Sequence, residues 1–205
     1  MDARAIRKKF GGDYEASERT FKMGIDHRFT AHLAERFRGR RVLETCTGAG
    51  FTTMALARTA KHVVSVEIEP AHQAQARRNL EKAGLLDCVS LVLGDVLSPG
   101  LLDRLPPVDA AFLDPDWNVT GPGHVYRFRE SNTKPPADAL LEAVLRITEN
   151  VALVLPPALD LRELEELLPH ERQELYLGRS HELHCLFFGS LGLAGGAVTE
   201  FRVEG

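Results

Sequence analysis

The feature that most constrains the fold is an apolar segment followed by two glycines and a helical pattern. Val42 to Thr45 predicts a short buried strand, Gly48 and Gly50 predict a tight turn, and residues 51–60 predict a helix. This order forms the nucleotide-binding corner of doubly wound α/β folds, in which ligands bind beyond the carboxyl ends of the strands. Glycine lets the backbone approach a ligand where a Cβ would clash. A Gly-x-Gly pair also occurs in ordinary tight turns, so neighbouring residues must identify the ligand.

Glu44 indicates that the ligand is cationic. A dinucleotide would place its pyrophosphate at the start of the helix, where backbone N–H groups favour an anion. A carboxylate four residues before Gly48 would repel that group, and Thr53 occupies the place of the third glycine of the dinucleotide fingerprint. S-adenosylmethionine carries an ammonium and a sulfonium. We therefore expect this cofactor, and an NAD-type oxidoreductase is disfavoured.

Composition predicts a cytoplasmic α/β protein that does not enter a membrane. A length of 205 residues suffices for one domain with a small extension. A composition of 44% hydrophobic and 26% charged residues is ordinary for a globular protein. No segment approaches the roughly 18 apolar residues of a membrane span, and the N-terminus does not resemble a secretory signal. Cys46, Cys88 and Cys185 lie far apart in apolar contexts, which is typical of reduced thiols and of neither disulfides nor a zinc site.

Charge is distributed unevenly. Residues 1–41 hold 11 Lys+Arg against 6 Asp+Glu, a balance of +5, so a net charge of −4 leaves −9 on the remainder. A basic segment ahead of an acidic domain can steer a polyanion to one face, although a solvated helix surface has the same composition. The negative total argues against strong nonspecific nucleic-acid binding.

The rest of the chain alternates predicted strands and helices, as expected for an α/β fold with a mostly parallel sheet. We expect an N-terminal helical extension over residues 1–38, the main domain over 39–191 and a tail over 192–205. The expected strands are 62–67, 89–93, 108–113 and 151–155, with a closing antiparallel pair at 171–177 and 182–191. The expected helices are 28–38, 70–83, 137–148 and a short one from Leu161.

Acidic residues at strand ends predict further cofactor contacts. Glu67 ends a strand 19 residues after Gly48, close to the spacing at which a carboxylate binds ribose hydroxyls. Asp95 follows the next strand and is expected to accept a hydrogen bond from an adenine amino group, between the apolar side chains of Ile68 and Val96. The alternatives are a solvated acid at Glu67 and, at Asp95, a cap for the next helix.

Asp114, Pro115 and Trp117 predict an acceptor site after the fourth strand. The only tryptophan of the chain lies in a polar turn, where an indole can stack on a base. An exocyclic amine is a poor nucleophile. A carboxylate that accepts one N–H, with the Pro115 carbonyl accepting the other, would hold its nitrogen towards a methyl donor. His181 and His184 should lie on opposite faces of an extended chain, so we expect no metal site there.

These residues resemble the ordered motifs of class I S-adenosylmethionine-dependent methyltransferases over roughly residues 21–191. Within that class, the Asp-Pro-Asp-Trp sequence, the following Gly121-Pro122-Gly123, the basic extension and the segment from Val151 to Pro156 resemble the trimethylguanosine synthase family, which methylates guanosine N2 of RNA caps. The resemblance implies a Rossmann-like, seven-stranded, mostly parallel sheet with an antiparallel edge strand. It also implies that Trp117 stacks on guanine. The implied cofactor residues are Met23, Glu44, Thr45, Gly48, Gly50, Phe51, Glu67, Ile68, Asp95 and Val96.

The sequence departs from this family at two places. Asp116 replaces the second proline of the motif, and the glycine-proline element lies further from the tryptophan. The expected activity is methylation of an exocyclic base amine, with RNA or a nucleotide as substrate. A methyltransferase for a small molecule or protein side chain, and an inactive cofactor- or RNA-binding protein, remain alternatives. The sequence does not indicate an oligomeric state.

Overall fold

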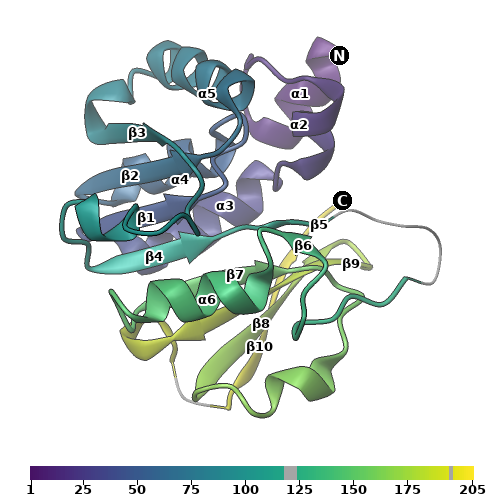
Figure 1. Ribbon diagram of the computed structural model, residues 1–205. Coiled ribbons are helices and arrows are strands. Elements are labelled where there is room, and N and C mark those ends of the chain that lie inside the picture. Colours follow the sequence, from purple (N-terminus) through teal and green to yellow (C-terminus); the bar gives the residue numbers. More distant parts are fainter. Residues whose placement is uncertain (118–123, 194–195) are drawn as a thin grey trace. The chain divides into compact units, whose positions relative to one another are not determined.

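The computed structural model describes residues 1–117, 124–193 and 196–205 and divides the chain into two units, residues 1–110 and 111–205. Each unit combines helices with a mostly parallel set of strands, which confirms the predicted α/β class (Figure 1). In the described part of the chain, no helix combines the length and the apolar character that crossing a bilayer requires.

Unit 1 is built on three parallel strands, β1 (Arg41–Thr45), β2 (His62–Glu67) and β3 (Val89–Leu93). Helices α4 (Phe51–Thr59) and α5 (Pro70–Ala83) connect them (Figure 1). The bounds of β2, β3 and α5 are those expected from the sequence. Proline in the first turn of α5 and Gly84, with φ of 68° at its C-cap, explain why this helix could be delimited.

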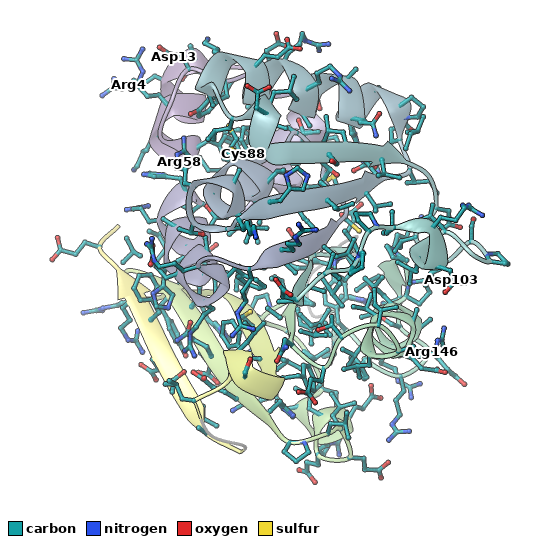
Figure 2. The ribbon with its side chains drawn as sticks, turned by 90° about the vertical axis from the view of Figure 1, so that its left-hand side faces the viewer. Arg4, Asp13, Arg58, Cys88, Asp103 and Arg146 are labelled. Atoms are coloured by element: carbon teal, nitrogen blue, oxygen red, sulfur yellow. The ribbon has the colours of Figure 1, made fainter. Side chains whose placement is uncertain are left out.

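The N-terminal segment of unit 1 contains α1 (Ala3–Phe10), α2 (Glu18–Met23) and α3 (His27–Ala34). The helix expected over residues 28–38 therefore ends earlier, and its last turn is a short 3-10 helix, Glu35–Phe37. Asp13 forms an ion pair with Arg7 at 2.6 Å, and it lies with Arg4 on the outer side of this segment (Figure 2).

The N-terminal segment packs, through aromatic side chains, against the start of α4, next to the glycine turn that follows β1. We call this turn and the start of α4 the cofactor corner. The ring of Phe10 stacks on that of Phe51 with 3.5 Å between centroids, and Phe21 meets Phe10 edge to face at 5.6 Å. Both Phe10 and Phe51 are buried. These rings join the N-terminal segment to the core of unit 1, because burying them stabilises the contact.

Unit 2 contains five neighbouring strands in the order β10-β8-β9-β7-β4. They are β4 (Ala110–Leu113, which begins at the last residue of unit 1), β7 (Val151–Leu155), β8 (His170–Leu177), β9 (Ser180–Phe188) and β10 (Val198–Val203). β9 is antiparallel to both β7 and β8, as expected for the closing pair. β9 is not the expected edge strand, because β7 and β8 flank it on its two sides. β10 is parallel to β8 and lies beyond it.

Three expectations about elements need correction. Within the described residues, the two units have eight strands longer than two residues rather than seven, because part of the expected tail forms β10. The short helix expected from Leu161 is a 3-10 helix, Leu161–Leu164. The helix expected over 137–148 is α6 (Ala137–Leu145), which ends earlier. A further two-stranded ladder joins β5 (Asp116–Trp117) to β6 (Thr133–Lys134), which the sequence did not predict. Other 3-10 helices are Leu86–Cys88, Leu102–Arg104 and Gly189–Leu191.

Candidate functional site

The turn after β1 has a backbone that only certain residues adopt easily. Gly48 and Gly50 have φ of 54° and 82°, and Cys46 has φ of 63°, an uncommon conformation for a residue with a Cβ. The Cys46 N–H donates to the Val66 carbonyl at 2.9 Å, which holds the turn against β2. A Cβ on Gly50 would lie 3.1 Å from the Cβ of Ala76, so glycine also permits α4 to approach α5.

Glu44 is buried directly beneath this turn. Its Oε2 accepts a hydrogen bond of 2.6 Å from the Ser65 hydroxyl, whose oxygen lies 2.6 Å from that of Thr47. Burial raises the pKa of Glu44 to about 7, the Ser65 hydrogen bond opposes this rise, and the charge of Glu67 adds to it. A nearby cation would favour the ionised form. Glu44 therefore fits the predicted role beside a positively charged ligand.

Glu67 is fixed by two backbone donors. Its Oε2 accepts from the Gly48 N–H at 2.8 Å, and its Oε1 accepts from the Glu69 N–H at 2.9 Å. Each carboxylate oxygen retains acceptor capacity, so the group can still bind a pair of hydroxyls. The structure thus brings Glu44, Gly48, Gly50 and Glu67 together around one turn, as the sequence predicted.

The predicted adenine contacts lie at the ends of β2 and β3. The Ile68 side chain is 66% exposed, and that of Leu93, which the sequence analysis did not single out, is 51% exposed. Val96 is buried. The Asp95 carboxylate accepts a hydrogen bond from the Leu97 N–H at 2.9 Å. This bond closes a turn and does not cap a helix, because the next helix, Leu102–Arg104, has Leu101 as its N-cap. That bond leaves acceptor capacity for a ligand.

The remaining predicted cofactor residues are less accessible. The Phe51 ring is packed on Phe10, so its backbone N–H at the start of α4 is the group that could face a ligand. Thr45 is buried, and its hydroxyl has no hydrogen-bond partner in the described ranges. Met23 is half-buried beside Gly24, where a Cβ would come within 2.9 Å of the Phe51 ring. Met23 thus ends α2 next to the cofactor corner.

Asn79 is a residue of this corner that the sequence analysis missed. It is fully buried on α5, and its Nδ2 donates to the carbonyls of Ala49 and Glu15, both at 2.9 Å. Its Oδ1 accepts from the Glu15 N–H at 2.8 Å. One side chain therefore ties the glycine turn to the N-terminal segment. A polar residue at an apolar position of the α5 pattern was the available signal.

The predicted acceptor residues begin unit 2. Asp114 follows β4 and is half-buried, and Pro115 is buried. Trp117 is only partly buried, and its backbone pairs with Thr133 in the β5–β6 ladder. The indole is therefore not a core side chain, and a second segment supports the turn that carries it. Gly121, Pro122 and Gly123 lie outside the described residues.

Glu163 anchors the described segment that follows Trp117. Its Oε1 accepts from the Arg127 side chain at 2.9 Å, and its Oε2 accepts from the N–H groups of Phe128 and Arg129 at 2.6 and 2.9 Å. The backbone hydrogen bond to Arg129, together with the Arg127 guanidinium and the Phe128 N–H, holds the pKa of Glu163 below its usual value despite desolvation. This segment consequently has a defined position beside the 3-10 helix Leu161–Leu164.

The expectation that His181 and His184 lie on opposite faces of the extended chain is wrong. A β-bulge in the pairing of β9 with β8 moves both side chains to one face, and their ring centroids lie 4.4 Å apart. Burial lowers the pKa of His184 to about 4, with the charges of His181 and Arg172 adding to the effect. Within the described ranges, no group of three or more His, Cys, Asp or Glu residues is arranged to hold a metal ion.

Comparison with known proteins identifies the family. Residues 39–179 match the model of the RNA cap guanine-N2 methyltransferase family. The chain belongs to this family. It is also 30% identical over 159 residues to the trimethylguanosine synthase of Schizosaccharomyces pombe, a match that covers 71% of this chain and 64% of that protein. The resemblance inferred from the motifs is therefore confirmed.

Other similarities are broader. The chain is 41% identical over 97 residues to a catechol O-methyltransferase of Mycobacterium tuberculosis, which covers 43% of this chain and 42% of the relative. The chain thus spans less than half of that relative and about two thirds of the trimethylguanosine synthase. A structure from Porphyromonas gingivalis, described as a candidate methyltransferase, has a TM-score of 0.74 at 19% identity over 93% of this chain and 48% of its own. That likeness establishes the Rossmann-like methyltransferase fold.

S-adenosylmethionine is the cofactor of this class of methyltransferase, and the corner around Gly48 fits it. The buried Glu44 carboxylate has a raised pKa, and the positively charged methionine end of the cofactor would favour its ionised form. The Glu67 carboxylate is oriented by backbone N–H groups and can accept ribose hydroxyls. The exposed Ile68 side chain would offer adenine an apolar surface.

Proposed function

We propose that the protein transfers a methyl group to an exocyclic amino group of a base in RNA. The observation that carries the proposal is the match to the RNA cap guanine-N2 methyltransferase family, combined with Asp114, Pro115 and Trp117 in the turn after β4. Glu44, Gly48, Gly50 and Glu67 bind the cofactor. Trp117 stacks on the acceptor base, which its partly exposed position permits.

Catalysis then depends on positioning rather than on a covalent enzyme intermediate. Asp114 accepts one N–H of the exocyclic amine and the Pro115 carbonyl accepts the other, so the nitrogen lone pair is directed at the donor. S-adenosylmethionine supplies an electrophilic methyl group bound to a sulfonium. When the cofactor is bound, the N–C bond would form as the C–S bond breaks with its electron pair remaining on sulfur, and the nitrogen would then lose a proton to water. Asp114 stabilises the positive charge that develops on nitrogen.

RNA as the substrate agrees with the basic N-terminal segment, although ion pairs offset part of its charge. Arg7, Lys22 and Arg38 each pair with a carboxylate of the same segment. The expected attraction for RNA is therefore modest at physiological ionic strength. Base stacking and the amine contacts must supply most of the selectivity.

The test is a methyl-transfer assay with isotopically labelled S-adenosylmethionine. The acceptors are RNA capped with 7-methylguanosine, the same RNA without a cap, DNA and catechol. Label on an exocyclic amine of an RNA base supports the proposal, and Trp117→Ala should abolish that transfer while cofactor binding measured by calorimetry persists. Cofactor binding without transfer to any acceptor would instead indicate a binding protein.

A second candidate is O-methylation of a small molecule. The 41% identity to a catechol O-methyltransferase over 97 residues favours it. Transfer to catechol that is independent of Trp117, with no label in RNA, would establish this alternative and reject the first proposal.

A further inference from the structure

Tyr126 has a buried hydroxyl that the fold does not use. The residue is 3% exposed, and its hydroxyl oxygen has no hydrogen-bond partner in the described part of the chain. Its ring meets that of His124 edge to face, with 4.5 Å between centroids. Its N–H donates to the Ala158 carbonyl at 2.7 Å, and its carbonyl accepts from the Asp160 N–H at 3.0 Å. The side chain is thus held in place without a partner for its polar atom.

An unpartnered buried hydroxyl opposes folding, because its hydrogen bonds to water are lost and not replaced. A phenylalanine would fill the same space without this penalty. The contrast with Tyr176 is direct, since that hydroxyl donates to Glu174 at 2.7 Å. The Tyr126 hydroxyl is therefore a buried polar group to which a bound ligand could supply the missing hydrogen bond.

Tyr126 belongs to the same unit as the acceptor residues, and the charge of Asp116 acts on its phenol. It follows the Asp114-Pro115-Asp116-Trp117 turn within unit 2, on the segment whose next residues Glu163 anchors. Burial raises the pKa of the Tyr126 phenol, and the Asp116 charge raises it further. The phenol accordingly keeps its proton at neutral pH and remains a hydrogen-bond donor.

We propose that the Tyr126 hydroxyl is a specificity-determining group that donates a hydrogen bond to a keto oxygen of the acceptor base. This inference rests on the proposed transfer to a base amine. A guanine offers a keto oxygen in addition to its exocyclic amine, whereas the equivalent position of adenine carries the amine itself. The bond would therefore favour guanine, and binding of the base would supply the partner that the hydroxyl lacks.

The test compares Tyr126→Phe with Tyr176→Phe, because each variant removes one hydroxyl and little else. The acceptors are guanosine-containing and adenosine-containing synthetic RNAs, with and without a 7-methylguanosine cap. Tyr126→Phe should lower kcat/KM for guanine acceptors about tenfold, mainly through KM, with urea stability unchanged or raised and S-adenosylmethionine affinity unchanged. Tyr176→Phe should lower stability and leave kcat/KM unchanged.

The outcomes separate this inference from the proposed function. If the wild-type protein methylates guanine in RNA and Tyr126→Phe does so equally well, the inference is wrong and the proposed function stands. A loss of stability in Tyr126→Phe with unchanged kcat/KM would likewise overturn it, because the hydroxyl would then serve the fold. If the wild-type protein transfers no methyl group to RNA, the proposed function fails first, and the inference fails with it.

Discussion

Replacing Glu44 with glutamine should make stability less dependent on pH. The pKa of this buried carboxyl is raised from 4.5 to about 7, so the folded protein holds its proton more tightly than the unfolded chain does. The free energy of unfolding should therefore fall as pH rises from about 4.5 to about 7, and then level off. A difference in pKa of this size between the folded and unfolded protein corresponds to about 3 kcal/mol. Glutamine keeps an oxygen that can accept the Ser65 hydrogen bond and removes the ionisation.

The assay is urea unfolding of wild type and Glu44→Gln at pH 5 and pH 8, without cofactor. The wild type should lose about 3 kcal/mol between these values from this group, and the variant should lack that component. Glu81→Gln, the same substitution at a solvent-exposed position on α5, is a matched control that should retain it. Equal pH dependence in wild type and Glu44→Gln would refute the assignment of a raised pKa to Glu44.

The same carboxyl should couple cofactor binding to proton release. At pH 7 about half of the Glu44 side chains are protonated in the free protein, and a bound cation favours ionisation. Calorimetry in buffers of different ionisation enthalpy should therefore detect release of about half a proton per S-adenosylmethionine bound. Glu44→Gln should bind more weakly and release none. Binding by wild type without proton release at pH 7 would show that the cofactor does not act on Glu44.

Three further substitutions test the construction of the site. Asn79→Leu removes the three hydrogen bonds that the Asn79 side chain forms with the backbone of Ala49 and Glu15. It should lower the free energy of unfolding by about 2–4 kcal/mol in urea titrations. Gly50→Ala introduces a Cβ 3.1 Å from that of Ala76 at φ of 82°, and should lower the melting temperature and cofactor affinity. Trp117→Ala should abolish methyl transfer to RNA while calorimetry shows unchanged cofactor binding. Unaltered values in any of these assays would contradict the corresponding contact.

Local signals allowed much of unit 1 to be predicted. Pro70 and Gly84 delimit α5, and the apolar run from His62 ends at the acidic Glu67, so the bounds of the helix and strand follow from neighbouring residues. Gly48 and Glu67 were placed together because parallel strands present their carboxyl ends at one edge of a sheet. The hydrogen bond between them confirms this placement.

Other features depend on contacts that no local pattern records. β10 follows a glycine-rich stretch and is half exposed, so its alternation of polar and apolar residues gave little signal until it paired with β8. The bulge that brings His181 to His184 requires the register of two strands. Asn79 and Ser65 become informative only when Ala49 and Glu44 are seen beside them. Tyr126 stands out because its burial leaves a hydroxyl without a partner.

The most direct test of the central claim is identification of the methylated nucleoside. Purified protein is incubated with labelled S-adenosylmethionine and 7-methylguanosine-capped RNA, the RNA is digested to nucleosides, and the products are separated and weighed by mass spectrometry. The account predicts that the label is found on the exocyclic amine of a guanine nucleoside and is lost in Trp117→Ala. Label on a ring carbon or on a ribose oxygen, or transfer only to catechol, would contradict it.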